Sequence, residues 1–116
     1  MRSGLITVNH LDSKRKIAVL GDMFDLGEMS DVIHIKLADV FKIVNYDYLF
    51  TLGNQAKKMA KAAEKYMNKK NIITFDGRED LIEKILEIAK KGDIFYFKAS
   101  NGMKFSSIVK DVEKKL

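Results

Sequence analysis

The fold is decided by a short stretch near the N-terminus, which reads Lys16-Ile17-Ala18-Val19-Leu20-Gly21-Asp22-Met23. Its first five residues are mostly aliphatic and β-branched, a composition that is typical of a strand. The apolar run then stops at a glycine and an aspartate, which favour a turn. A strand that is followed at once by a polar turn is therefore expected at this place in the chain.

Three later segments are expected to be strands for the same reason, namely Asp47–Leu52, Asn71–Phe75 and Asp93–Lys98. The stretches between and after them carry apolar residues at helical spacing, which predicts helices with one buried face at residues 33–44, 56–67, 81–89 and 105–116. Alternation of strand and helix predicts an α/β fold, a three-layer sandwich with a mainly parallel sheet and helices on both faces.

The first dozen residues are expected to form a further helix, with Leu5, Val8 and Leu11 facing inward. A unit of strand, helix and parallel strand needs a strand before that helix. We therefore expect that the first strand of the natural domain is missing and that the domain begins upstream of Met1.

Polar residues and glycines at the predicted helix ends suggest caps. Ser30 is expected to cap the helix that starts near Asp31, and Asp76 with Glu79 has the spacing of a capping box. Gly92, which follows two lysines, is expected to be the glycine that terminates the helix before it.

The composition suits one soluble domain that spans residues 1–116. The chain has 116 residues, no cysteine, and a formal net charge of +5, and we expect a reducing, cytoplasmic setting. No signal peptide or apolar run long enough for a membrane span is apparent in the sequence. The lysines are spread over helix faces and ends without interleaved aromatic residues, so they predict a solvated surface rather than a nucleic-acid site.

Four loops that follow the predicted strands are rich in Gly, Asp, Asn and Ser, and ligands bind at this end of open parallel sheets. Gly53-Asn54 and Asp76-Gly77 are expected to be ordinary turns. Two loops are more informative, residues 21–23 and residues 98–102, the latter reading Lys98-Ala99-Ser100-Asn101-Gly102. A lysine, a serine and an asparagine close together at a helix N-terminus favour binding of a carboxylate or phosphate.

Several catalytic signatures are absent from the sequence. There is no G-x-x-x-x-G-K-[ST] loop to hold a nucleotide phosphate and no cluster with metal-ligand spacing. Ser100 lacks the G-x-S-x-G context of a nucleophile. We therefore expect neither catalytic residues nor a metal site in this chain. His34 is interpreted either as a packing histidine or as part of the rim around the site.

Residues 15–30, RKIAVLGDMFDLGEMS, together with His34, resemble a pattern of the MurF group of the Mur ligase family, R-x-I-A-V-L-G-D-M-x-E-L-G-E-x-S with a histidine in the next helix. Residues 47–53 resemble the next strand and glycine of that group. Residues 92–103, GDIFYFKASNGM, resemble its G-D-x-x-L-x-K-G-S-R-x-M segment. Ala99 and Asn101 replace a glycine and an arginine, and asparagine lacks the charged fork of arginine.

The resemblance implies a Rossmann-like C-terminal domain of a three-domain ligase that adds D-Ala-D-Ala to UDP-MurNAc-tripeptide. Such an enzyme holds ATP and magnesium on its central domain, activates the peptide carboxylate as an acyl phosphate, and closes the C-terminal domain over the site. The missing central and N-terminal domains would be this domain's partners, and this chain alone is expected to be inactive and to bind no cofactor. By the same resemblance, the residues expected on the acceptor and nucleotide side are Lys98, Ser100 and Asn101, with Asp22, Glu28 and His34 nearby.

Three alternatives remain open from the sequence. The first is another amide ligase of the Mur superfamily with a different acceptor. The second is a stand-alone module that binds an anion or a protein. The third, a nucleic-acid binder, would lose affinity steeply with salt.

Overall fold

The computed structural model describes residues 2–11, 14–24, 27–100 and 103–115. Its strands are β1 (Arg15–Gly21), β2 (Tyr48–Leu52), β3 (Ile72–Phe75) and β4 (Asp93–Lys98). Its α-helices are α1 (Arg2–Asn9), α2 (Ser30–Leu37), α3 (Ala56–Ala63), α4 (Arg78–Ile88) and α5 (Phe105–Lys115), and its short 3-10 helices are η1 (Gly27–Met29), η2 (Ala38–Lys42) and η3 (Lys69–Asn71). None of the helices in these ranges has the length and apolar content that a membrane crossing requires.

The four strands form one parallel sheet in the order β3-β2-β1-β4. The strands end nearly level, because Gly21 lies opposite Leu52, Leu52 opposite Phe75, and Leu20 opposite Lys98. We call this end of the sheet the carboxyl end, and the opposite end, where the strands begin, the amino end. The turns that follow β1, β2 and β4 therefore meet at one place in space.

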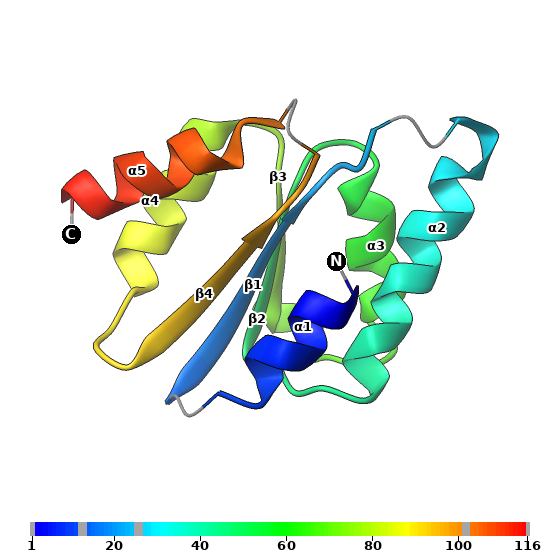
Figure 1. The fold of residues 1–116 in the computed structure, drawn as a ribbon, viewed down its shortest axis with the longest axis horizontal. Helices are drawn as coiled ribbons and strands as arrows, with labels where there is room; N and C mark the ends of the chain where they lie inside the picture. The colour runs from blue at the N-terminus through cyan, green and yellow to red at the C-terminus, as the bar shows by residue number, and fades with distance from the viewer. Residues whose placement is uncertain (1, 12–13, 25–26, 101–102, 116) are drawn as a thin grey trace.

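Helices cover both faces of the sheet, which confirms the predicted three-layer α/β arrangement. In Figure 1, α1, α2 and α3 lie on one side of the strands, and α4 and α5 lie on the other. Successive residues of β1 serve the two sides in turn, as the two-residue period of a strand requires. Ala18 and Leu20 pack in the core under α1 and α3, whereas Ile17 and Val19 pack in the core under α4 and α5.

The predicted strands are confirmed within a residue at each end, but the single helix predicted over residues 33–44 is divided into two helical segments. α2 ends at Leu37, and the chain continues as the tighter 3-10 helix η2. The predicted inward face survives this change of pitch, because Val40, Phe41 and Val44 are buried and Leu37 packs against the same core. Within α2 the fully buried residue is His34, which the predicted apolar face did not include.

The predicted caps are also wrong. Ser30 is the first residue of α2 rather than its cap, and its hydroxyl donates to Gln55 Oε1 (3.2 Å). α4 is preceded by Gly77 without a side-chain cap, while Asp76 pairs with Lys57 Nζ at 2.5 Å. These polar side chains found partners on other elements, which local spacing does not reveal.

Two further inferences about chain ends need correction. Gly92 does have a positive φ of 96°, but α4 has already ended at Ile88, and Gly92 lies in the turn before β4. Leu11 is 49% exposed, because α1 ends at Asn9 and the chain leaves the helical path. Leu5 is fully buried, as predicted, and Val8 packs against the same core.

The amino end of the sheet is held by an ion pair between the first residues of β1 and β4. Arg15 Nε and Nη2 donate to the two carboxylate oxygens of Asp93 at 2.9 and 2.6 Å, and Nη2 also donates to the Ile88 carbonyl (2.7 Å). The Asp93 side chain is only 3% exposed. The hydrogen bonds from Arg15 hold the pKa of Asp93 below its ordinary value, although burial opposes that shift.

Candidate functional site

The carboxyl end of the sheet carries an open groove of about 640 Å³. Helices α3, α4 and α5 begin beside it, and the free amides at a helix N-terminus carry partial positive charge. The groove contains two carboxylates and one guanidinium, so it suits a polar, partly charged ligand better than an apolar one. Its lining residues are Asp22, Leu52, Gly53, Asn54, Asp76, Arg78 and Met103.

Asp22 follows β1 directly and is buried, with 8% of its surface exposed. Its Oδ1 accepts a hydrogen bond from the backbone N of Ala56 at 2.7 Å, at the first residue of α3. Gln55, the residue before α3, offers no side-chain cap, so Asp22 supplies that function from another loop. One oxygen of the carboxylate therefore fixes α3 on the end of β1.

Gly53 is required by that arrangement. Its φ is 114°, which side chains rarely tolerate, and a Cβ atom here would lie 2.6 Å from the Asp22 carboxylate. The sequence interpretation of this position as a turn glycine with positive φ is confirmed. The close approach to Asp22 adds a second reason that the sequence did not reveal.

Ser100 joins the loop after β4 to the loop after β1. Its backbone N donates to the Asp22 carbonyl (3.1 Å), and its hydroxyl oxygen accepts from the backbone N of Phe24 (2.6 Å). The two loops that the sequence analysis singled out are thus bonded directly to one another. The Ser100 hydroxyl is engaged with the protein in this arrangement.

His34 lies beneath the same loop and is fully buried. Its Nε2 accepts from the backbone N of Met23 (3.1 Å), and its Nδ1 is 2.7 Å from the Ser30 carbonyl oxygen. Since the Met23 amide can only donate and the Ser30 carbonyl can only accept, these two contacts fit a neutral imidazole with the proton on Nδ1. Of the two interpretations left open by the sequence, His34 is a packed residue, and it is bonded to the rim loop.

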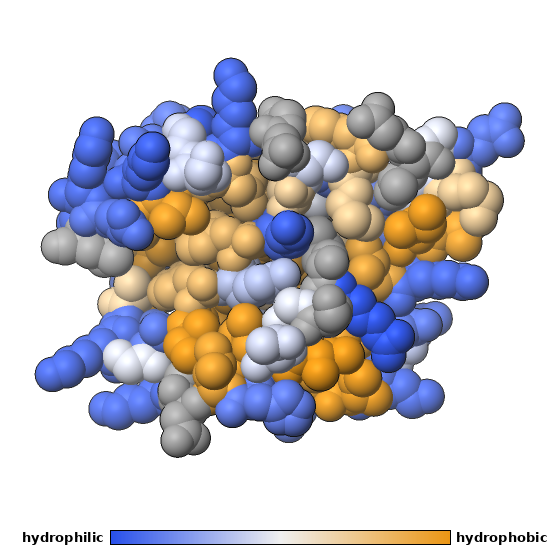
Figure 2. Space-filling view, viewed as in Figure 1, coloured by the Kyte–Doolittle hydropathy of each residue, from blue (hydrophilic) through white to orange (hydrophobic). Residues whose placement is uncertain are grey.

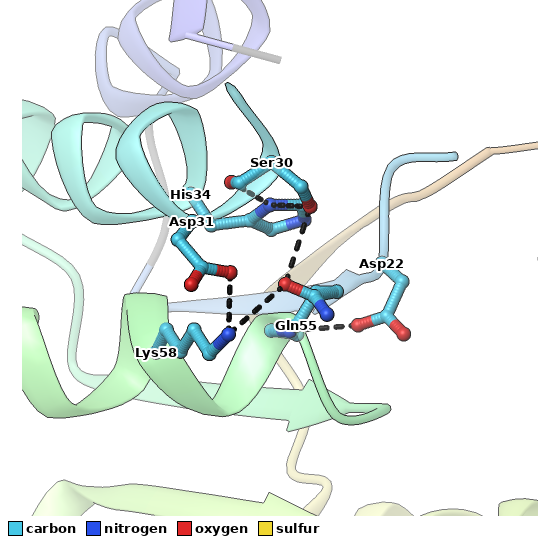
Figure 3. A network of polar contacts seen from close by, with 7 residues as sticks. Asp22, Ser30, Asp31, His34, Gln55 and Lys58 are labelled. Atoms are coloured by element: carbon cyan, nitrogen blue, oxygen red, sulfur yellow. Dashed lines mark hydrogen bonds and ion pairs between the residues drawn. The ribbon is translucent and has the colours of Figure 1, made fainter. Parts of the chain in front are cut away.

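A chain of polar contacts runs from His34 to α3 (Figure 3). The Ser30 hydroxyl lies 3.4 Å from His34 Nδ1 and donates to Gln55 Oε1. Lys58 Nζ donates to Gln55 Oε1 at 3.4 Å and pairs with Asp31 on the first turn of α2. These contacts tie the start of α2 to the start of α3.

The other predicted site residues lie apart from this network. Glu28 is exposed on η1, and Lys98 is exposed at the last position of β4. Asn101 lies outside the described residues. The structure therefore bonds His34 and Ser100 to the Met23 and Phe24 amides, next to Asp22, and leaves Glu28 and Lys98 on the surface.

Sequence reasoning missed Arg78 and Gln55. Arg78 begins α4 at the groove, and its Nη2 donates to Ser107 Oγ (3.0 Å) and Asp111 Oδ2 (2.6 Å) on α5. Its place directly after the turn that follows β3 was the available signal. Across the part of the chain that the structure describes, no group of three or more His, Cys, Asp or Glu residues is placed to hold a metal ion.

Comparison with known proteins identifies the family of this chain and proteins with the same fold. The family described as "Mur ligase, glutamate ligase domain" matches residues 1–101. The chain is 37% identical over 98 residues to UDP-N-acetylmuramoyl-tripeptide--D-alanyl-D-alanine ligase of Bacillus subtilis (strain 168), covering 84% of this chain and 21% of the relative. It is 29% identical over 109 residues to the enzyme of the same name from Synechocystis sp. (strain ATCC 27184 / PCC 6803 / Kazusa), covering 94% of this chain and 24% of the relative.

Two solved structures share the fold. The MurF ligase of Thermotoga maritima in complex with ADP has a TM-score of 0.69 at 24% identity and is matched over 99% of this chain and 25% of its own. MurF from Acinetobacter baumannii has a TM-score of 0.78 at 17% identity, over 97% of this chain and 24% of its own. The chain spans roughly a fifth to a quarter of the length of the curated relatives it matches.

Proposed function

We propose, because this chain belongs to the Mur ligase, glutamate ligase domain family, that it works within an ATP-dependent ligase that joins D-alanyl-D-alanine to UDP-N-acetylmuramoyl-tripeptide. The relatives from Bacillus subtilis and Synechocystis carry that activity in their names. The Thermotoga structure that shares the fold was solved with ADP, which fits the use of ATP. Both ATP and the nucleotide-linked precursor are cytoplasmic molecules, so we place the reaction there.

One observation supports this proposal above the others. The two segments that resemble the MurF group, the loop after β1 and the loop after β4, are hydrogen-bonded to each other through Ser100, and Asp22 of the first loop lines an open groove. Helix N-termini and Arg78 supply positive charge beside that groove, and Asp22 and Asp76 supply negative charge. A groove of mixed charge suits a dipeptide, which carries both an ammonium group and a carboxylate, and the polar groups of a nucleotide.

The proposed role is orientation of the acceptor and closure of the site. The sequence holds no phosphate-binding loop, and the described residues offer no ready metal site. We therefore assign ATP and magnesium to other domains of the complete ligase, where they supply activation of the peptide carboxylate. This domain would close over that site, exclude water and align the amine, which is a contribution of geometry rather than of bond chemistry.

Within this proposal the site residues have different tasks. Lys98, exposed at the carboxyl end, would bind the dipeptide carboxylate, and Asn101 would assist without the charge of arginine. Asp22, Ser100 and His34 would hold the rim in place, since their polar atoms are bonded to backbone amides. Glu28 would lie at the outer margin of the closed site.

The proposal is tested by Lys98→Ala in the complete ligase, with phosphate release measured as D-Ala-D-Ala is varied. Loss of a charged hydrogen bond should raise the KM for D-Ala-D-Ala roughly tenfold or more. Lys91→Ala is the matched control, since Lys91 is an exposed lysine before β4 at the amino end. An unchanged KM would contradict the assignment of Lys98.

The acceptor itself is tested by a panel of D-Ala-D-Ala, D-alanine and D-glutamate, since the family description names glutamate. Turnover that depends on D-Ala-D-Ala is expected. Turnover with glutamate alone would replace the proposed acceptor and leave the family unchanged. Purified alone, this chain is expected to hydrolyse no ATP, and robust hydrolysis would contradict the division of labour between domains.

A further inference from the structure

Helix α2 buries a histidine completely and leaves several of its apolar side chains exposed. Its fully buried residue is His34, whereas Val32 and Ile35 are 43% and 47% exposed, and Met29 just before it is 54% exposed. Apolar side chains reach the surface over α2, at the right of Figure 2. A surface helix ordinarily buries its apolar residues and exposes its polar ones. Leu37 packs the end of α2 against the core, whereas Met29, Val32 and Ile35 contribute little burial at its start and middle.

The outer side of α2 is also loosely packed against its neighbour. An open hollow of about 510 Å³ lies between α2 and α3, with Ile35 on one wall and Lys58, Ala62 and Lys65 among the residues on the other. The contacts that fix the start of α2 are polar ones, from His34 to Met23 and from Ser30 to Gln55. A buried imidazole with both nitrogens bonded meets the requirement that buried polar groups find partners.

The loop above α2 is held at consecutive residues. The Asp22 carbonyl accepts from Ser100 N, the Met23 amide donates to His34, and the Phe24 amide donates to the Ser100 hydroxyl. The bond to His34 is the one in this set that comes from α2. The position of residues 22–24 is therefore coupled to the position of that helix.

We infer that His34 is a positioning residue, which holds the loop of residues 22–24 in place through Met23 as a neutral imidazole protonated on Nδ1. His34 does not reach the groove, whose lining residues do not include it. It acts through the loop, and the loop carries Asp22, which caps α3 and lines the groove. The inference that His34 affects ligation rests on the proposed function, whereas the inference that His34 holds residues 22–24 in place does not.

The first experiment measures the tautomer of His34 in this chain by NMR, from the nitrogen chemical shifts of its ring. The expected result is a protonated Nδ1 and an unprotonated Nε2 at neutral pH. A proton on Nε2 would overturn the inference, because Nε2 could then not accept from Met23. This readout uses the unaltered protein, so it does not depend on whether any variant folds.

The second experiment compares His34→Gln with His34→Asn by hydrogen exchange at the Met23 amide. A glutamine carbonyl reaches about as far as Nε2 and can accept from Met23, whereas asparagine reaches only about as far as Nδ1. Exchange at Met23 should accelerate roughly tenfold or more in His34→Asn and be largely restored in His34→Gln. Val32→Ala, on the exposed side of α2, is the control and should change nothing. Equal protection of Met23 in both His34 variants would overturn the inference.

The third experiment places both variants in the complete ligase. His34→Asn should raise the KM for D-Ala-D-Ala several-fold, and His34→Gln should restore the original KM. A variant that merely yields less folded enzyme would show a lower apparent kcat and an unchanged KM. If the ligase lacks turnover with D-Ala-D-Ala, the proposed function fails and the exchange results still decide the role of His34. If exchange responds but KM does not, His34 serves the fold alone and the inference about the site is wrong.

Discussion

Two aspartates with buried side chains, one at each end of the sheet, form different kinds of contact. Asp93 at the amino end meets the guanidinium of Arg15 through both carboxylate oxygens. Asp22 at the carboxyl end meets a backbone amide of α3 and stands at the open groove. The amino end is thus closed by a charge pair between two strands. The carboxyl end is held by hydrogen bonds to backbone groups, which leave the rim open toward a ligand.

The two contacts should therefore differ in what they contribute: the pair at the amino end to the free energy of unfolding, and the contact of Asp22 to the geometry of the groove. A paired charge that is nearly removed from water is costly to break, because the remaining partner keeps its desolvation penalty. A carboxylate that accepts from a neutral amide keeps most of that contact when its charge is removed but its shape is kept. Substitutions that remove only charge should therefore affect the two ends unequally.

The largest effect is expected for Asp93→Asn. The change leaves Arg15 without its anionic partner, and the free energy of unfolding should fall by about 3 kcal/mol, the low end for a buried pair because the Arg15 side chain is 23% exposed. Urea denaturation of this chain measures that value. The matched control is Asp111→Asn, whose carboxylate pairs with Arg78 on an exposed surface, with Asp111 43% exposed at its side chain, and should cost about 1 kcal/mol or less. If both variants lost the same free energy of unfolding, burial of the Arg15–Asp93 pair would not explain its contribution to stability.

The same pair predicts a pH dependence with a definite sign. The folded pKa of Asp93 lies below its ordinary value of 3.8 because Arg15 stabilises the charged form. Its contribution is therefore complete above the unfolded pKa and is lost as the pH falls through the folded pKa. The stability gap between the unaltered chain and Asp93→Asn should be full near pH 6 and shrink steadily below about pH 4.

The strands and most helices could be predicted from sequence, for physical reasons that also explain the failures. The strand over residues 16–20 can be recognised as an apolar run because both faces of β1 are buried. Helix α3 can be recognised from its apolar stripe because Met59 and Ala63 face the same core. On α2 the predicted apolar face was right where Leu37 packs against the core, but no apolar pattern could show that His34 is fully buried.

The sequence could predict where the candidate site lies in the fold, but it could not predict which atoms of its residues are hydrogen-bonded to one another. Parallel strands end level, so the loops containing Asp22 and Ser100 had to meet. The choice of partner depends on distances between side chains and backbone atoms of other elements, and no local pattern encodes them. From the sequence we predicted that Asp22 and Ser100 lie near a ligand. In the structure the side chains of both residues accept hydrogen bonds from backbone amides. Their contact with an acceptor stays a prediction.

A smaller effect is expected for Gly53→Ala at the carboxyl end. The new Cβ would need a φ of 114° and would lie 2.6 Å from the Asp22 carboxylate. The strain, about 1–3 kcal/mol, should be relieved partly by displacement of Asp22 from the start of α3. Gly77→Ala is the control, because its φ is −126° and no atom lies within 4 Å of the added carbon. Thermal unfolding of the two variants measures the contrast, and similar melting temperatures would contradict it.

The smallest effect is expected for Asp22→Asn, and it decides the comparison. Asparagine keeps an oxygen at the position that accepts from Ala56, so the cap on α3 should survive. Only the favourable interaction of a negative charge with the helix N-terminus is lost, about 0.5 kcal/mol. Asp22→Ala, which removes the acceptor as well, should cost about 1–2 kcal/mol in the same urea titration. If Asp22→Asn cost as much as Asp93→Asn, charge rather than shape would hold the carboxyl end, and the two ends of the sheet would work by one principle.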